Sequence, residues 1–168
     1  MRACVEEVLA AMMEYYAGYP VQINHFLKVY GFAKTIGQQE GLPGREQEIL
    51  EVAAVVHDIG IKVSWEKYGD SSGKHQELEG PAVTEKLLKD LGYDAQLISR
   101  VSKLVGRHHT YTGIDGMDCQ ILIEADFLVN LYEEEASAET IASVKKKIFR
   151  TSAGIRILEA LYEQKRND

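Results

Sequence analysis

The sequence contains few cysteines, no excess of basic charge and no long apolar run. Its 168 residues include only two cysteines, Cys4 and Cys119, and no CxxC pair. This excludes a disulfide framework, and we expect both cysteines to be small core residues. Acidic residues outnumber basic ones 26 to 19, for a net charge of -7. That balance argues against a surface that binds a nucleic-acid polymer. It still permits a small anionic substrate that is held by a few local cations.

The sequence also has no segment that resembles a membrane span or a signal peptide. No apolar stretch approaches the length of a membrane span. The first segment, MRACVEEVLAAMMEYY, carries Glu6 and Glu7 inside its apolar part, unlike a signal peptide. We therefore expect a cytoplasmic protein with no membrane partner. Its length suits a single domain with a sizeable core, and an oligomer is compatible with the sequence.

Apolar residues recur with a helical period along almost the whole chain, and no alternating strand pattern is convincing. The breaks between periodic segments contain Pro or Gly: Pro20, EGLPG at 40–44, YGDSSGK at 68–74, LGYD at 91–94 and TGIDG at 112–116. The predicted helices span about 2–17, 22–39, 46–60, 77–91, 94–109, 117–135 and 138–164. The longest irregular stretch is predicted at about 61–76, and long loops often form part of a site.

Polar residues interrupt three of the most apolar segments. His57 and Asp58 end the run EVAAVVHDIG at 51–60, His25 shares a helical face with apolar residues, and Asp126 is embedded in CQILIEADFLVNLY. An unpaired buried carboxylate is costly unless it meets a cation or its pKa shifts. Each residue alone could be a hydrogen-bonded core residue. One metal ion bound by all four explains them together, because it neutralises the carboxylates and binds neutral imidazole.

The ordered set of His25, HD at 57–58 and Asp126 resembles the H…HD…D pattern of the HD-domain superfamily of metal-dependent phosphohydrolases. The segments HFLKVYGFAKTIG, VVHDIG and ILIEADFLVNL are similar to the helices that carry these ligands in that family. The resemblance covers about residues 22–160. It implies an all-α helical bundle with the site between core helices. Together with the chain length, this predicts a single domain over 1–168, with a helix within 1–20 packed on the core.

The resemblance also implies one or two divalent transition-metal ions, of Fe, Mn, Co, Ni or Zn. Where such proteins hold two ions, the aspartate at position 58 would bridge them. The branch that hydrolyses diadenosine tetraphosphate carries His-Gly-Pro at the start of the next helix, whereas this chain has LEGPAV, with Glu79 in place of that histidine. His75 lies four residues earlier. A histidine eighteen residues before the last Asp favours His108 over His109. We therefore expect Glu79 and His108 at the second ion, with His75 and His109 as alternatives.

These ligands would suit hydrolysis of a phosphate ester. Two bridged ions would lower the pKa of a shared water and hold a phosphoryl oxygen, and nearby cations would stabilise the charge that develops on phosphorus. Lys62 and Arg107 flank the ligand segments, so they join Asp58 as candidate catalytic residues, although each could be a solvated surface cation.

The predicted function is therefore a metal-dependent phosphomonoesterase or phosphodiesterase that acts on a nucleotide or another small phosphate ester through a metal-activated water. Two alternatives remain. An HD-type diiron oxygenase has a similar ligand pattern. A non-catalytic sensor of a small ligand would not need His57 and Asp58 together.

Overall fold

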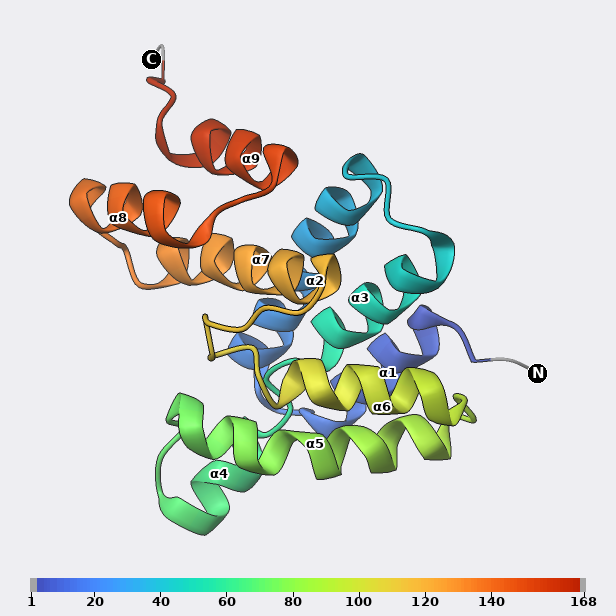
Figure 1. Ribbon diagram of the computed structural model, residues 1–168. Coiled ribbons are helices and arrows are strands. Elements are labelled where there is room, and N and C mark those ends of the chain that lie inside the picture. Colours follow the sequence, from blue (N-terminus) through green and yellow to red (C-terminus); the bar gives the residue numbers. More distant parts are fainter. Residues whose placement is uncertain (1–2, 167–168) are drawn as a thin grey trace.

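The computed structural model describes residues 3–166, and within this range the chain forms nine α-helices and no strand (Figure 1). In chain order they are α1 (Val5–Tyr15), α2 (Pro20–Gln39), α3 (Gly44–Val56), α4 (Ile61–Tyr68), α5 (Gly73–Asp90), α6 (Ala95–Val105), α7 (Met117–Glu133), α8 (Ala138–Ile148) and α9 (Ser152–Tyr162). The predicted all-α class is confirmed. None of the helices in the described range has the length and apolar character needed to span a membrane.

Helices α3 and α7 form the centre of the molecule. α3 packs against α1, α2, α6 and α7, and α7 also packs against α2, α8 and α9. Residues 49–56 of α3 and 118–126 of α7 are all buried, because neighbouring helices cover these segments on every side. Their apolar side chains supply much of the hydrophobic core. The C-terminal end of α3 therefore delivers the residues that follow it into the interior.

Helix α1 supports the turn that follows α3. Its buried residues Val8 and Met12 face the core. Tyr16, which ends the helix and is 1% exposed, donates its hydroxyl to the carbonyl of Ile59 at 2.9 Å and lies 3.3 Å from that of Asp58. A buried phenol usually finds such a partner. The N-terminal helix thus fixes the backbone of the segment in which we expected metal ligands.

The predicted irregular stretch at 61–76 is wrong for most of its length. α4 occupies Ile61–Tyr68, and only residues 69–72 separate it from α5. Gly69 ends α4 in the left-handed conformation, with φ +70°, which glycine adopts without strain. Ser72 caps α5 by accepting a hydrogen bond from the backbone N–H of His75. Gly69 and Ser72 of YGDSSGK are thus the caps of two helices.

The predicted single helix at 138–164 is also wrong, because the chain breaks into α8 and α9. The buried carboxylate of Glu124 accepts hydrogen bonds from the backbone N–H groups of Arg150 and Thr151, each at 3.1 Å. It also accepts one from the Thr151 hydroxyl at 2.7 Å. Thr151 in turn caps α9 through the N–H of Gly154. A negative charge at a helix N-terminus is favourable, so a side chain of α7 determines where α9 begins.

Candidate metal centre

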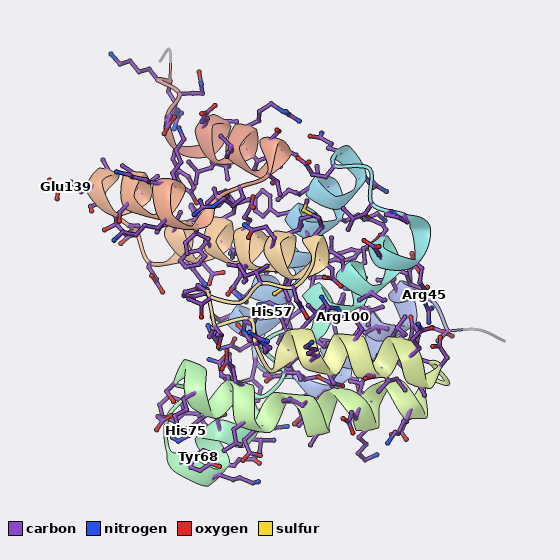
Figure 2. The ribbon with its side chains drawn as sticks, in the orientation of Figure 1. Arg45, His57, Tyr68, His75, Arg100 and Glu139 are labelled. Carbon is purple, nitrogen blue, oxygen red and sulfur yellow. The ribbon has the colours of Figure 1, made fainter. Side chains whose placement is uncertain are left out.

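Four ligand-type side chains converge where α2, α7 and the turn after α3 meet. His25 lies on α2, His57 and Asp58 follow α3, and Asp126 lies on α7. All four are buried, and each contributes one nitrogen or oxygen to a group in which these atoms lie within 4.8 Å of one another. Figure 2 marks His57 in the interior of the molecule. The sequence prediction that these four residues meet therefore agrees with the geometry.

The ring nitrogens and carboxylate oxygens of this group face each other closely. Nε2 of His25 lies 3.1 Å from Asp58 Oδ2 and 3.3 Å from Asp126 Oδ1. Nε2 of His57 lies 3.4 Å from each of the same two oxygens. The two Nε2 atoms are themselves 3.0 Å apart. Four atoms that carry lone pairs or negative charge thus surround one small volume.

The far nitrogen of each imidazole explains why Nε2 points inward. Nδ1 of His57 donates to the carbonyl of Ala54 at 2.8 Å, and Nδ1 of His25 lies 2.9 Å from a carboxylate oxygen of Glu133. Carbonyl and carboxylate oxygens only accept hydrogen bonds. In the neutral rings the proton is therefore on Nδ1, and the lone pair of Nε2 is directed at the carboxylates, as in metal-binding histidines.

One atom of the group supports a bound cation directly. Asp126 Oδ1 is buried and, among the described residues, has no hydrogen-bond partner. A buried unpaired carboxylate oxygen is costly, and the Nε2 lone pairs of two neutral rings would repel each other at 3.0 Å. A metal ion bound by the four residues would satisfy all these atoms at once. Nitrogen and carboxylate ligands suit a divalent transition metal.

The electrostatics of the group also favour positive charge. Burial lowers the pKa of His25, but the Asp126 and Asp58 carboxylates, at 3.3 and 3.1 Å from its Nε2, outweigh this effect and raise the pKa to about 11. Burial likewise opposes the charge on His57, but the negative charge of Asp58 raises its pKa to about 9. Burial raises the pKa values of both aspartates, and the histidines reverse this so that both stay low. In the absence of a metal ion, the group therefore binds protons.

A second, smaller group shares Asp58. His108 Nε2 lies 3.0 Å from Asp58 Oδ1, and His109 Nε2 lies 3.8 Å from the same oxygen. His108 donates Nδ1 to the carbonyl of Val105 at 2.8 Å, so its ring is oriented like those of the first group. Asp58 directs Oδ2 toward the first group and Oδ1 toward the second. Both members of the histidine pair therefore approach this group, and not only the favoured His108.

Glu79 and His75 do not join either group, so the expectation for Glu79 requires correction. Glu79 accepts hydrogen bonds from Lys67 Nζ at 2.9 Å and the Tyr68 hydroxyl at 2.7 Å. His75 lies 2.6 Å from Asp70 Oδ1 and stacks on Tyr68, well away from His57 in Figure 2. Lys67 and Tyr68 reach these residues because they lie on α4, in a segment that we had expected to be irregular.

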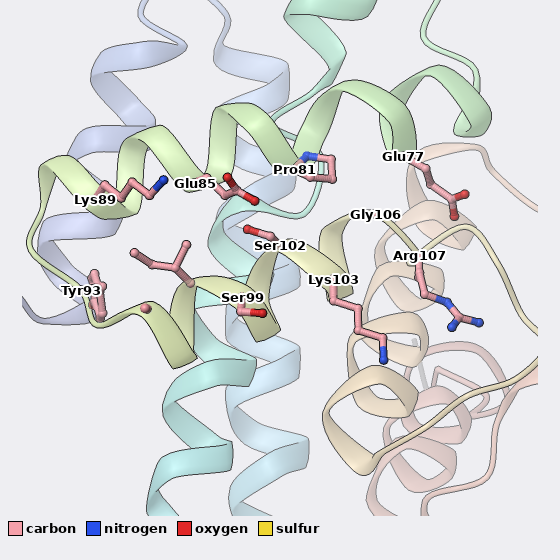
Figure 3. Close-up of a pocket in the computed structure, with 12 residues that line it drawn as sticks. Glu77, Pro81, Glu85, Lys89, Tyr93, Ser99, Ser102, Lys103, Gly106 and Arg107 are labelled. Carbon is pink, nitrogen blue, oxygen red and sulfur yellow. The ribbon is translucent and has the colours of Figure 1, made fainter.

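Lys62 and Arg107 are engaged away from the ligand atoms. Lys62 Nζ lies 4.8 Å from the ring centroid of Tyr15 and 3.4 Å from its carbonyl oxygen. The Arg107 guanidinium donates to the carbonyl oxygens of Thr112 and Gly113. It also lies at one end of an open cavity of about 680 Å³ between α5 and α6 (Figure 3). The structure thus gives both cations local partners instead of directing them at the four-residue group.

The sequence analysis missed one residue beside the centre, Glu133. Its carboxylate contacts His25 Nδ1 and also lies 3.3 Å from Lys28 Nζ. Glu133 follows Asp126 by seven residues on α7, so the two share a helical face. Lys28 follows His25 by three residues on α2, one turn away. That spacing was the available signal, but a charged residue near a helix end is usually solvated and did not stand out.

Comparisons with known proteins agree with this geometry. Residues 23–148 match the family model described as HD domain. A solved structure with a TM-score of 0.69 is the crystal structure of a predicted HD superfamily hydrolase from an uncultured Thermotogales bacterium. It is 26% identical in sequence, and the match covers 94% of this chain and 84% of that one. No curated protein matches the chain.

Proposed function

Since this chain belongs to the HD domain family, we propose that it is a metal-dependent phosphohydrolase acting on a nucleotide or another small phosphate ester. The observation that carries the proposal is the convergence of two imidazole nitrogens and two carboxylates on one buried volume. The likeness to a predicted HD superfamily hydrolase supports hydrolysis as the reaction class. The phosphate ester is our proposal for the substrate.

A divalent ion held by His25, His57, Asp58 and Asp126 would lower the pKa of a bound water and polarise a phosphoryl oxygen. Other residues of the chain orient the ligand side chains. The Ala54 carbonyl and Glu133 fix the two imidazole rings, and fixed ligands hold an ion without reorganisation during the reaction.

Two surface features beside the centre support a nucleotide. Tyr111 is 42% exposed and packs against Phe127, the neighbour of Asp126, with ring centroids 5.2 Å apart. An exposed aromatic ring can stack on a nucleobase. Lys28 lies beside Glu133 and close to His25 along α2. Because its partner Glu133 contacts His25, Lys28 lies closer to the ligands than the partners of Lys62 and Arg107 place those cations, and it is the cation that we favour for contacting a phosphate.

An anaerobic assay tests the proposal. Metal-free protein is reconstituted with Mn, Co or Ni and supplied with a panel of nucleotides and other phosphate esters. We expect release of phosphate or of a nucleoside monophosphate, and loss of that release in Asp58→Ala. His75→Gln is the matched control, because it changes a histidine outside both groups and should retain activity.

The same panel, repeated in the presence of oxygen and with the iron-loaded protein included, discriminates the alternatives. Absence of hydrolysis across the panel, together with oxygen uptake that appears only for the iron form, would favour a diiron oxygenase. Saturable binding of a nucleotide without turnover of any compound would favour a sensor. Either result would contradict the proposed phosphohydrolase.

A further inference from the structure

His109 differs from the other three histidines of the centre in which of its ring nitrogens has a hydrogen-bond partner outside the two aspartates. His25, His57 and His108 have their Nδ1 atoms paired and their Nε2 atoms directed at aspartates. In His109 it is Nε2 that is paired, at 2.9 Å from Oε1 of Gln76. The same Nε2 is the atom that approaches Asp58 Oδ1, at 3.8 Å. The hydrogen bond to Gln76 therefore competes with any metal ion for that nitrogen.

The partners of Gln76 determine which atom carries the proton. Its Nε2 lies 2.6 Å from the carbonyl oxygen of Ser71, and a carbonyl can only accept. The amide NH₂ group must therefore face Ser71, and the amide oxygen must face His109. Because that oxygen also only accepts, His109 has to donate Nε2–H. A protonated ring nitrogen has no lone pair left for a metal ion.

The surroundings hold this arrangement in place. Gln76 is 7% exposed, so its amide has little access to water as an alternative partner. The backbone N–H of His109 donates to Glu77 Oε1 at 3.0 Å, which ties the histidine to α5. Gly73 also lies against the ring, since a Cβ there would come within 3.1 Å of His109 Cβ and Cγ. His109 cannot turn toward Asp58 without disturbing several contacts.

We propose that Gln76 is a positioning residue that keeps His109 out of the ligand set, so that the centre binds one metal ion much more tightly than a second. The inference rests on the proposed function only in that the four-residue group binds a metal ion. With His109 occupied, the second group offers Asp58 Oδ1 and His108 Nε2, whereas the first offers four ligands. A transition metal generally takes at least four ligands, so the second ion would need water to complete its shell.

Titration of metal-free protein with Co²⁺, followed by visible absorption and calorimetry, tests the proposal. We expect the native chain to bind one ion tightly and a second at least tenfold more weakly. Gln76→Leu removes the acceptor at similar size, and it should tighten the second ion by about tenfold, the scale on which partners of ligands act. Gln96→Leu, an exposed glutamine on α6, is the matched control and should change neither step.

Two further variants separate a ligand effect from a structural one. His109→Leu in the native background should leave both affinities unchanged, and Gln76→Leu combined with His109→Leu should abolish the gain of the second ion. Long-range ¹H–¹⁵N spectra should show the His109 proton on Nε2 in the native chain with one ion bound, and this readout does not depend on the Gln76 variant folding.

Several results would overturn the proposal. These are two ions of similar affinity in the native chain, an unchanged second step in folded Gln76→Leu, loss of the second ion in His109→Leu alone, or a proton on Nδ1 of His109. Failure of the proposed function can be distinguished from failure of the Gln76 proposal. Tight binding of the first ion without hydrolysis of any ester contradicts the phosphohydrolase and leaves the Gln76 effect measurable. Absence of any metal binding overturns both.

Discussion

The orientation of each imidazole is the feature that distinguishes this centre from a set of buried polar residues. A core histidine can be satisfied by any two partners, but here Nδ1 of His25, His57 and His108 is paired and Nε2 is directed at an aspartate. Repetition of one arrangement on three separate segments is difficult to explain by packing alone. It is the arrangement expected of a metal centre, in which a partner on the far nitrogen fixes the ring.

Replacing Asp58 tests whether the ligands share one ion. Asp58→Ala should lose most bound metal and most activity, because this carboxylate faces both groups. We expect a change of less than about 3 kcal/mol in the free energy of unfolding, since the cost of burying the carboxylate disappears. One of the two histidines can lose its proton while the other stays charged beside Asp126, so no buried charge remains unpaired. Elemental analysis and denaturant titration are the measurements. Full metal content in the variant would refute the shared site.

Glu133 offers a second test at the level of one residue. Glu133→Ala removes the acceptor for His25 Nδ1, so the affinity for the first ion should fall by about 10–100-fold. Glu133→Gln should cost less, because its amide oxygen can still accept the Nδ1 proton. Competition with a chromogenic chelator measures the affinity. Glu134→Ala, which changes the exposed neighbouring carboxylate, is the control. Equal affinities for Glu133→Ala and the native chain would show that this contact does not position His25.

At the scale of the helices, local periodicity predicted the fold class, and contacts from distant segments explain the errors. The break between α8 and α9 has no Gly or Pro, because its cause is the Glu124 carboxylate on α7, which captures the N–H groups of Arg150 and Thr151. Helix α4 was not predicted because the residues that follow it include Gly and Ser, which indicated a loop. Its capping Gly69 and Ser72 resemble loop residues when they are read without the helices that they end.

At the junction between α7 and α9, we predict that replacing Gly154 destabilises the fold. A Cβ at Gly154 would collide with Glu124 Oε1 and lie 2.6 Å from Thr151 Oγ1. Gly154→Ala should therefore displace the buried carboxylate from its hydrogen bonds, at a cost of about 1–3 kcal/mol. Thermal denaturation measures the loss, and the metal content should stay unchanged.

Gly31 on α2 supplies the matched control for that substitution. Nothing lies within 4 Å of a Cβ built at Gly31, and alanine in a helix is preferred to glycine by roughly 0.5–1 kcal/mol. Gly31→Ala should therefore raise the melting temperature slightly. If both variants behaved alike, the Glu124 contact would not be what makes Gly154 necessary.

At the scale of the molecule, the packing of α2, α3 and α7 brings together residues that lie far apart in the sequence. His25 and Asp126 could be singled out from the sequence alone, because a polar residue on an apolar helical face is unusual whichever helix packs against that face. Glu79 could not be placed correctly, because its direction depends on Lys67 and Tyr68 of the unexpected α4. Gln76 gave no signal at all, since a glutamine in a helix is ordinary until its partners are known. Side chains whose role depends on a neighbouring helix were therefore beyond prediction.

Because the four ligands join α2, α7 and the turn after α3, a bound ion should stabilise the whole fold. An ion that binds only the folded chain adds about 2.7 kcal/mol at a hundred times its dissociation constant. In the metal-free protein the pKa values of His25 and His57 are raised from 6.5 to about 11 and about 9. Protonation of these histidines therefore stabilises the metal-free fold fully below about pH 6.5, and this contribution is lost as the pH rises through 9 and then 11.

A metal ion has to displace these protons, so its advantage should grow with pH. We expect the melting temperatures of metal-loaded and chelator-treated protein to differ little at pH 6 and increasingly up to pH 9, as measured by scanning calorimetry. Asp58→Ala should show no such difference at any pH, because it lacks the carboxylate shared by both groups. A difference that stays constant or narrows as the pH rises would mean that the ion does not compete with protons on His25 and His57, and so does not bind between them.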